Sequence, residues 1–292
     1  MTAAPPGRTG RLAAVVTLTV LIAVTGFVAG RASAPSGVPA RATGSVAGHA
    51  GHDVGGLSIT QGGYTLVLLA TPTAAGVPGE LVFQITGPDG NPVTAYRRNH
   101  ERELHLIVVA RDFTGYRHLH PDRDPDGTWR VPLTLPASGA YRVFADFVPT
   151  GAAGGPGGVA DPVTLGADLL LPGTYPARGP LPVDEATVLV DGYTVTLDGG
   201  LRPGQASQML VWLGRDGSPV PDLEPYLGSY GHLVALRHGD LGYLHVHPAP
   251  ATSASSVVAF AVQVPSAGTY QLFFEFQHQA VVHTAEFSLA AY

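Results

Sequence analysis

After residue 40, the apolar residues of this chain fall in short runs that glycine or proline separates. No long stretch there repeats its apolar residues every three or four positions, as an amphipathic helix does. The runs 105–110 and 232–237 (HLIVVA and HLVALR) are almost entirely apolar, as are 141–147 and 270–276 (YRVFADF and YQLFFEF). Short runs rich in Val, Leu, Phe and Tyr are typical of β-strands, and a run without polar alternation indicates a strand buried on both faces. The pattern predicts an all-β protein.

Much of this pattern occurs twice. Each copy contains H-x12-H-x-H-P, and each histidine of the second copy lies 127 residues after its counterpart. The six residues are His105, His118 and His120 in the first copy and His232, His245 and His247 in the second. The segments 135–147 and 264–276 also match, so the repeating unit is about a hundred residues long, a usual domain size. We predict two tandem β-sandwich modules of the immunoglobulin or cupredoxin type, at 57–150 and 185–292, with a linker at 151–184.

An uncharged apolar segment of 18 residues, 12–29, follows two arginines near the N-terminus. It is long enough to cross a bilayer and longer than the usual apolar part of a signal peptide. Residues 1–34 are thus a membrane anchor or a cleaved signal peptide, and the proline after the cleavage-like Ala-Ser-Ala favours the anchor. Residues 35–56 are rich in Ala, Gly and Ser and predict a flexible linker. Because arginines on the short N-terminal side favour an N-inside orientation, we expect the modules to be extracytoplasmic, either on a single membrane pass or secreted.

The composition narrows the possible chemistry. The chain has no cysteine and two methionines, which excludes disulfides, thiolate nucleophiles, cysteine-bound zinc, iron–sulfur clusters and blue copper. It has 16 basic and 22 acidic residues without a basic cluster, so we expect no nucleic-acid partner. Any metal would be held by imidazole and carboxylate groups, which suit copper(II), zinc or nickel.

The histidine pattern predicts a convergent site in each module. Residues two apart in a strand point to the same face, so the two histidines of each H-x-H pair project together. A hairpin with a four-residue loop at 111–114 places His105 opposite His120, and the equivalent loop gives the same pairing in the second copy. A register slip of one residue would turn His105 away from the pair.

Two acids occupy matching positions late in the last shared strand, Asp146 and Glu275. Each is a candidate fourth ligand or a partner for an imidazole; alternatively, each closes an ion pair at the strand edge. The other six histidines lie outside the pattern: His49 and His52 in the linker, His100 and His238 in loops expected at the surface, and His278 and His283, which could enlarge the second site.

The segments that carry the pattern resemble a known group of proteins. ELHLIVVARDFTGYRHLHP and GHLVALRHGDLGYLHVHP, with PSAGTYQLFFEFQHQAVVHTAEFSL behind the second, are similar to exported actinobacterial two-module proteins of unassigned function, over about residues 57–290. Some of those proteins carry a heavy-metal or copper label, so the resemblance implies metal handling. A looser likeness to CopC-like periplasmic copper carriers implies small β-barrels with histidine ligands, although the N-terminal histidine of those carriers is missing here.

We therefore expect an exported, non-catalytic protein that binds a divalent transition metal, copper(II) or zinc, for metal handling or resistance. The predicted ligands are His105, His118, His120 and Asp146, and His232, His245, His247 and Glu275. The alternative is a structural or interaction β-sandwich of the cell envelope, in which the histidines bond backbone carbonyls. Three histidines with an open position also suit a catalytic zinc. Yet motifs such as G-x-S-x-G and H-E-x-x-H do not occur, so we expect no enzyme. Beyond the metal and the membrane, the sequence indicates no particular partner.

Overall fold

The computed structural model describes residues 54–150, 161–175, 179, 183–249 and 253–292. Every regular element in these residues is a β-strand, so the all-β prediction is confirmed. The apolar segment 12–29 and most of the expected linker 35–56 lie outside the described residues. Within the described ranges, no helix is long and apolar enough to span a membrane.

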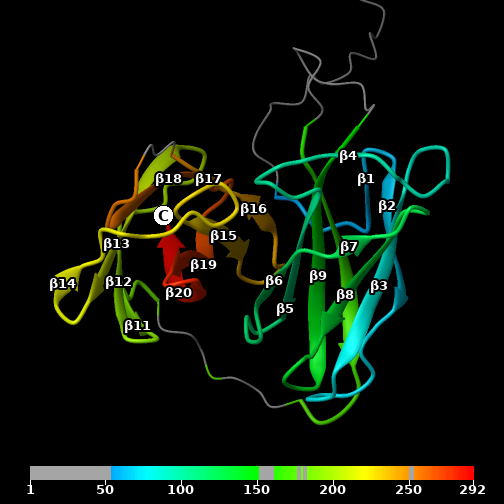
Figure 1. The fold of residues 1–292 in the computed structure, drawn as a ribbon, viewed down its shortest axis with the longest axis horizontal. Coiled ribbons are helices and arrows are strands. Elements are labelled where there is room, and N and C mark those ends of the chain that lie inside the picture. Colours follow the sequence, from blue (N-terminus) through cyan, green and yellow to red (C-terminus); the bar gives the residue numbers. More distant parts are fainter. Residues whose placement is uncertain (1–53, 151–160, 176–178, 180–182, 250–252) are drawn as a thin grey trace, which may run out of the picture. The chain divides into compact units, whose positions relative to one another are not determined.

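The first module consists of two antiparallel sheets (Figure 1). One sheet has the strand order β1-β2-β3-β8-β7, and the other has the order β10-β9-β5-β6, with β4 paired to β9. The strands are β1 Thr60–Gln61, β2 Tyr64–Ala70, β3 Gly79–Thr86, β4 Tyr96–Arg97, β5 Leu104–Ala110, β6 Arg117–Leu119, β7 Asp122–Arg123, β8 Thr128–Leu133, β9 Gly139–Pro149 and β10 Val163–Leu171.

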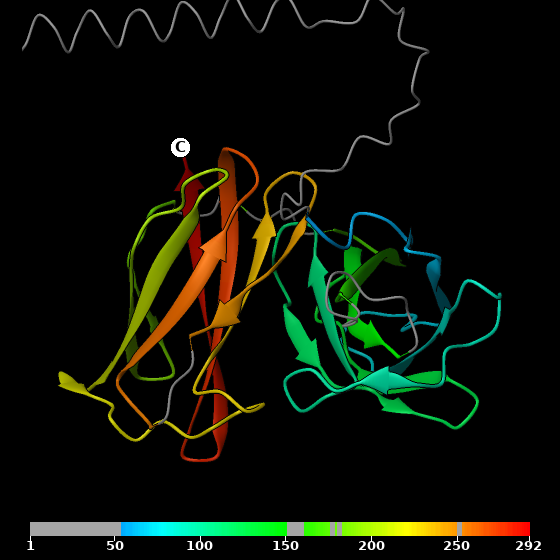
Figure 2. The same cartoon turned by 90° about the horizontal axis from the view of Figure 1, so that it is seen from above.

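The second module, whose strands run from yellow-green to red in Figure 2, repeats this topology. Its sheets have the orders β11-β12-β13-β18-β17, with β14 on β13, and β16-β15-β19-β20. The strands are β11 Thr187–Val190, β12 Tyr193–Asp198, β13 Ala206–Arg215, β14 Ser218–Pro219, β15 His232–Arg237, β16 Tyr243–His245, β17 His247–Pro248, β18 Val257–Gln263, β19 Gly268–His278 and β20 Val281–Ala291. Matching β5 to β15 and β9 to β19 makes the strand orders of the main sheets identical, which confirms the tandem β-sandwich repeat.

Each module has its own apolar core between its two sheets. In the first module the Trp129 ring packs against Phe83 and Tyr96, at ring-centre distances of 6.2 and 5.2 Å. In both modules a buried tyrosine near the start of a long strand, Tyr141 in β9 or Tyr270 in β19, donates its hydroxyl to the carbonyl four residues upstream. This bond is the tyrosine corner typical of immunoglobulin-like sandwiches.

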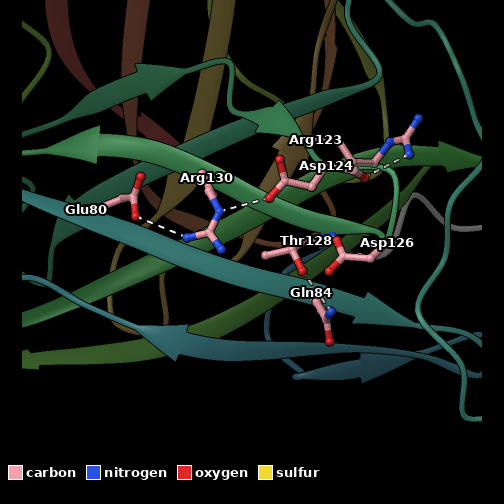
Figure 3. A network of polar contacts seen from close by, with 7 residues as sticks. All are labelled: Glu80, Gln84, Arg123, Asp124, Asp126, Thr128 and Arg130. Carbon is pink, nitrogen blue, oxygen red and sulfur yellow. Dashed lines mark hydrogen bonds and ion pairs between the residues drawn. The ribbon is translucent and has the colours of Figure 1, made fainter.

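The outer face of the first sheet is polar (Figure 3). Arg130 bonds Asp124 at 2.9 Å and Glu80 at 3.3 Å, and the Gln84 amide donates to the Thr128 hydroxyl at 2.9 Å. Half-exposed ion pairs of this kind add little stability, but they suit a face in contact with water. The outward face of the other sheet includes the apolar residues Ile107, Val109 and Phe144, and this part of the face requires a cover.

The second module provides this cover. Five apolar residues from each module form a third cluster, Ile107, Val109, Phe113, Tyr116 and Phe144 with Val234, Leu236, Leu241, Tyr243 and Phe273. Tyr116 stacks on Phe273 with ring centres 3.9 Å apart, and Tyr243 lies 5.6 Å from Phe144. The two tyrosines are repeat counterparts, and so are the two phenylalanines. The copies therefore meet through equivalent surfaces, as subunits do in a two-fold dimer, and β5 is buried along its whole length, as its apolar run predicted.

One segment that we assigned to the linker 151–184 belongs to the first module. Residues 163–171 form β10, which pairs with β9 over its full length. The counterpart of β10 is β20, but the glycine-rich segment before β10 breaks the match between the copies. Comparison of the two copies therefore could not align β10 with β20, and the sequence analysis missed this strand.

The end of the expected flexible linker, residues 54–56, lies against both modules. Gly55 exchanges two backbone hydrogen bonds with Tyr243 of the second module, at 2.8 and 3.0 Å. The Arg142 guanidinium of the first module donates to Gly56 O at 2.6 Å. These bonds hold the segment at the junction of the two modules.

Candidate metal centre

The three histidines of the first copy lie together at one end of the β5–β6 hairpin. Ile107 pairs with His118, which is the register expected from the sequence and sets His105 opposite His120, just beyond β6. One ring nitrogen of each histidine lies within 4.8 Å of the others. We call these residues the first triad; their spacing could accommodate one metal ion.

The chain crosses from one sheet to the other directly after the triad. β6 ends at Leu119, and beyond Pro121 the chain enters β7, which pairs with β8 in the opposite sheet. Proline has no N–H to offer to a strand ladder, so it suits the point where pairing with one sheet ends. The triad therefore lies at an edge of the sandwich, outside the apolar core.

The triad rings are spaced as ligands of a single ion would be. Their centres are 5.2 Å apart for His105 and His118, 5.2 Å for His105 and His120, and 4.8 Å for His118 and His120. An imidazole bound at about 2.0 Å has its centre about 3.2 Å from the metal, so two such rings stand about 4.5 Å apart at a right angle and about 5.2 Å at the tetrahedral angle. All three observed distances fall in this range.

Acceptors occupy the outer nitrogens of two of these rings. His105 Nε2 lies 2.9 Å from Asn99 O and must donate, since a carbonyl only accepts. His118 Nδ1 lies 2.5 Å from Glu275 Oε2. Metal-binding histidines usually donate their other N–H in this way. His105 Nδ1 and His118 Nε2 then face each other at 3.0 Å. With His118 donating to Glu275, both atoms carry lone pairs in the neutral rings, and a metal ion between them would bind both.

His120 completes the triad with an unsatisfied nitrogen. Its Nε2 is buried and has no hydrogen-bond partner among the residues that the structure describes. Burial, reinforced by the neighbouring His118 ring, lowers the pKa of His120 to about 2 and that of His105 to about 4. Metal ligands must be deprotonated, so these rings offer their lone pairs without competition from protons at neutral pH.

The carboxylate beside the triad comes from the second module. Glu275 lies in β19 opposite His232, is 4% exposed, and forms its ion pair with His118. We expected Glu275 to serve the histidines of its own copy. It reaches the first triad because the two modules pack through equivalent outer faces, which brings the acid of one copy to the histidines of the other.

His232 repeats the arrangement of His105. Its Nε2 donates to Tyr226 O at 2.7 Å, and Tyr226 is the repeat counterpart of the residue that bonds His105. Burial lowers the pKa of His232 to about 4. The ring centre lies 6.5 Å from that of His118, so one histidine of the second copy stands beside the first triad.

The two remaining histidines of the second copy have different strand partners. His245 pairs with Val234, in the position that His118 occupies in the first copy. This register sets His247 opposite His232, as in the first copy, and His247 also begins β17, where it pairs with Ala261 of β18 in the other sheet. The side chains of these two histidines lie outside the described part of the structure.

Asp146, the counterpart of Glu275, lies opposite His105 in β9. It is buried and accepts a hydrogen bond from Thr164 Oγ1 at 3.0 Å. Burial raises the pKa of Tyr243 well above its usual value, and the hydrogen-bonded Asp146 carboxylate adds to that shift. Asp146 is therefore a buried acid beside the triad.

His100, which we expected at the surface, lies beside the site. Its ring centre is 6.1 Å from that of His105 and 5.2 Å from that of His232. The repeat comparison missed it because its counterpart in the second copy is Leu227. No local sequence signal marks a loop histidine that only tertiary packing brings to a site.

Three other histidines have partners elsewhere. His238 stacks on Phe113 with ring centres 4.4 Å apart. His278 bonds the Tyr193 hydroxyl at 2.7 Å, and His283 bonds an Asp191 carboxylate oxygen at 2.8 Å. The contacts of His278 and His283 lie within the second module, whereas Phe113, the partner of His238, belongs to the first. His49 and His52 lie outside the described residues.

The fold and the site define a two-module β-sandwich protein with a histidine cluster that could hold a metal. The chain belongs to the family described as "Domain of unknown function (DUF8832)", whose model matches residues 59–154 and 186–292. A comparison with curated proteins gave no match.

Similar solved structures include a conserved adhesin of Escherichia coli, FdeC, with 13% identity and a TM-score of 0.25. The match covers 80% of this chain and 66% of the adhesin chain, so this chain spans just under two-thirds of the adhesin's length. Domains 4 and 5 of the S-layer protein SbsC match with 11% identity and a TM-score of 0.23, over 80% of this chain and 98% of that one. A chimeric titin Z1Z2 tandem matches with 15% identity and a TM-score of 0.20, over 77% of this chain and 96% of the titin chain.

Proposed function

We propose that this protein binds a divalent transition-metal ion at the first triad, as an exported, non-catalytic protein for metal handling or resistance. The observation that carries the proposal is the pair of facing nitrogens, His105 Nδ1 and His118 Nε2, 3.0 Å apart with their outer N–H groups already bonded. One metal ion between these two nitrogens would bind both lone pairs. The unpartnered Nε2 of His120 supplies a third imidazole.

Copper(II) is the ion that we expect. Three imidazoles supported by a carboxylate form a nitrogen site of intermediate softness, which suits copper(II) and zinc. At a given site of this type copper(II) binds more tightly than the other divalent first-row ions, so it should win in direct competition. Zinc is the second candidate.

The proposed role is binding at the envelope rather than catalysis. Glu275, the carboxylate bonded to the triad, orients His118 and is not placed as a free base. The apolar segment 12–29 behind two arginines supports an extracytoplasmic location, on a membrane anchor or after secretion. In that location the protein would meet metal ions before they enter the cell.

The test is metal titration of the purified full-length chain. We expect binding of copper(II), and more weakly of zinc, with a dissociation constant below about 1 μM. The variant H105N/H118N/H120N should lose this binding while keeping its near-ultraviolet circular dichroism spectrum. The matched control H49N/H52N removes the linker histidines and should bind as the wild type does.

Two results would overturn the proposal. One is a wild-type chain that binds neither ion in this range. The other is a triple variant that binds as tightly as the wild type. A folded protein without metal affinity would favour the alternative, an envelope interaction protein whose histidines are structural.

A further inference from the structure

Residues 54–58, which we call the strap, lie along the edge strand β10 of the first module. Gly56 N–H donates to Thr164 O at 2.8 Å, and Gly166 N–H donates to Ser58 O at 2.9 Å. β10 is an edge strand of its sheet, and such an edge leaves backbone groups open to another chain segment. The strap fills part of this edge with residues of the same chain.

The strap also bonds the second module, at its edge strand β16. Gly55 exchanges two backbone hydrogen bonds with Tyr243 of that strand, and Val54 packs against the core of the second module. The Arg142 guanidinium in β9 donates to Gly56 O from Nε and Nη2, at 3.2 and 2.6 Å. The strap therefore joins an edge strand of one module to an edge strand of the other.

Two glycines make this fit possible. Gly56 has a φ of 70°, a conformation that residues with a side chain rarely adopt. At Gly166 in β10, a Cβ atom would overlap Gly56 O, so only glycine allows the strap to lie directly on the strand. An alanine at 166 suits β10 itself and excludes the strap.

The backbone partners of the strap also hold the buried acid beside the first triad. Thr164 Oγ1 donates to Asp146 at 3.0 Å, and the Tyr243 hydroxyl bonds the same carboxylate. The same junction brings Glu275 of the second module to His118. The strap is thus one residue away from groups that contact the metal centre on both sides of the junction.

We propose that the strap controls metal binding at the first triad by fixing the orientation of the two modules, so that Glu275 reaches His118. The inference rests on the proposed function, because its readout is the metal affinity of the triad. The apolar cluster between the modules holds them together but is non-directional, whereas the hydrogen bonds of the strap have a defined direction. Displacement of the strap leaves the apolar contact in place and loses the orientation.

Two variants of the full-length chain displace the strap from opposite sides. G166A puts a Cβ atom where Gly56 O lies, and G56P removes the N–H of Gly56 and cannot adopt its positive φ. The matched control is G200A, because a Cβ atom at Gly200 meets nothing within 4 Å in the described structure. Far-ultraviolet circular dichroism checks that both modules fold in all three variants.

Two measurements report on the strap and on the site separately. Amide hydrogen exchange at Tyr243, which donates to Gly55 O at 3.0 Å, should be slow in the wild type and at least about tenfold faster in both strap variants. The affinity for copper(II) should fall by about 10- to 100-fold, the loss expected when a metal-binding histidine loses its carboxylate partner. G166A should cause a smaller loss in the E275Q background, because both changes act on the same contact.

The outcomes separate the two proposals. Unchanged exchange at Tyr243 in both strap variants, or fast exchange with wild-type copper affinity, overturns the control by the strap and leaves the proposed function standing. An equal loss from G166A with and without E275Q overturns the route through Glu275. A wild type that binds neither copper(II) nor zinc overturns both proposals.

Discussion

Replacement of Glu275 by glutamine should weaken metal binding while leaving the apo fold intact. The glutamine side chain has nearly the same volume, and its carbonyl oxygen can still accept the N–H at His118 Nδ1. What disappears is the negative charge 2.5 Å from that nitrogen. A charge-assisted hydrogen bond is about twice as strong as a neutral one, and the charge makes the imidazole a better electron donor.

The expected loss in affinity is about 10- to 100-fold, the usual effect of removing the carboxylate partner of a metal-binding histidine. This corresponds to about 1.4 to 2.7 kcal/mol. The assay is a competition titration of copper(II) and zinc against a chelator of known affinity, at pH 7.4 and fixed ionic strength. Thermal unfolding in the presence of a chelator checks the apo fold.

The matched control is E286Q. Glu286 is an exposed acid on β20, the strand next to Glu275, so this variant removes the same formal charge outside the site. E286Q should bind metal with nearly the wild-type affinity. Equal losses in the two variants would mean that net charge matters and the contact between the modules does not. Wild-type affinity in E275Q would refute the role of the second module at the triad.

Three further outcomes follow from the same geometry. Tyr116 and Tyr243 are repeat counterparts, but the Tyr116 hydroxyl is buried without a partner in the described structure, whereas Tyr243 bonds Asp146. Y116F should therefore leave the free energy of unfolding unchanged or raise it, whereas Y243F should lower it by about 1 kcal/mol. Urea denaturation measures both changes, and a decrease in both variants would contradict this reasoning. His232 has a pKa of about 4 in the folded protein and of about 6.5 in the unfolded chain, so the unfolded chain binds more protons between these pH values. The stability of the metal-free protein should therefore fall as the pH drops from 6.5 to 4, and this ring should contribute a loss of about 2 kcal/mol at pH 5. H232N should flatten that slope. Binding of the metal ion at pH 7.4 should release less than about one proton, because burial already keeps His105 and His120 deprotonated. Calorimetry in buffers of different ionisation enthalpy measures the release, and about one proton per imidazole would contradict it.

The sequence pattern was sufficient for the fold class and for the first triad hairpin. Both predictions depend only on residues close together in the sequence. Apolar runs bounded by glycine and proline predict the strands, and the length of the 111–114 loop sets the register between His105 and His120. The repeat itself predicted that the two modules would share one topology, and the strand orders of their main sheets agree. The missed strand β10 shows the limit of repeat comparison where a glycine-rich insertion interrupts it.

The sequence by itself determined which residues can bind a metal and which of them share a face of a hairpin, because both follow from residue type and from the two-residue period of a strand. Only the tertiary structure decided which groups meet. Glu275 and His100 join the histidines because two equivalent apolar faces bury each other at the module junction. The burial of these apolar faces is non-directional and depends only on the area covered. A local sequence pattern therefore cannot predict which polar groups meet at the edge of the contact between the modules.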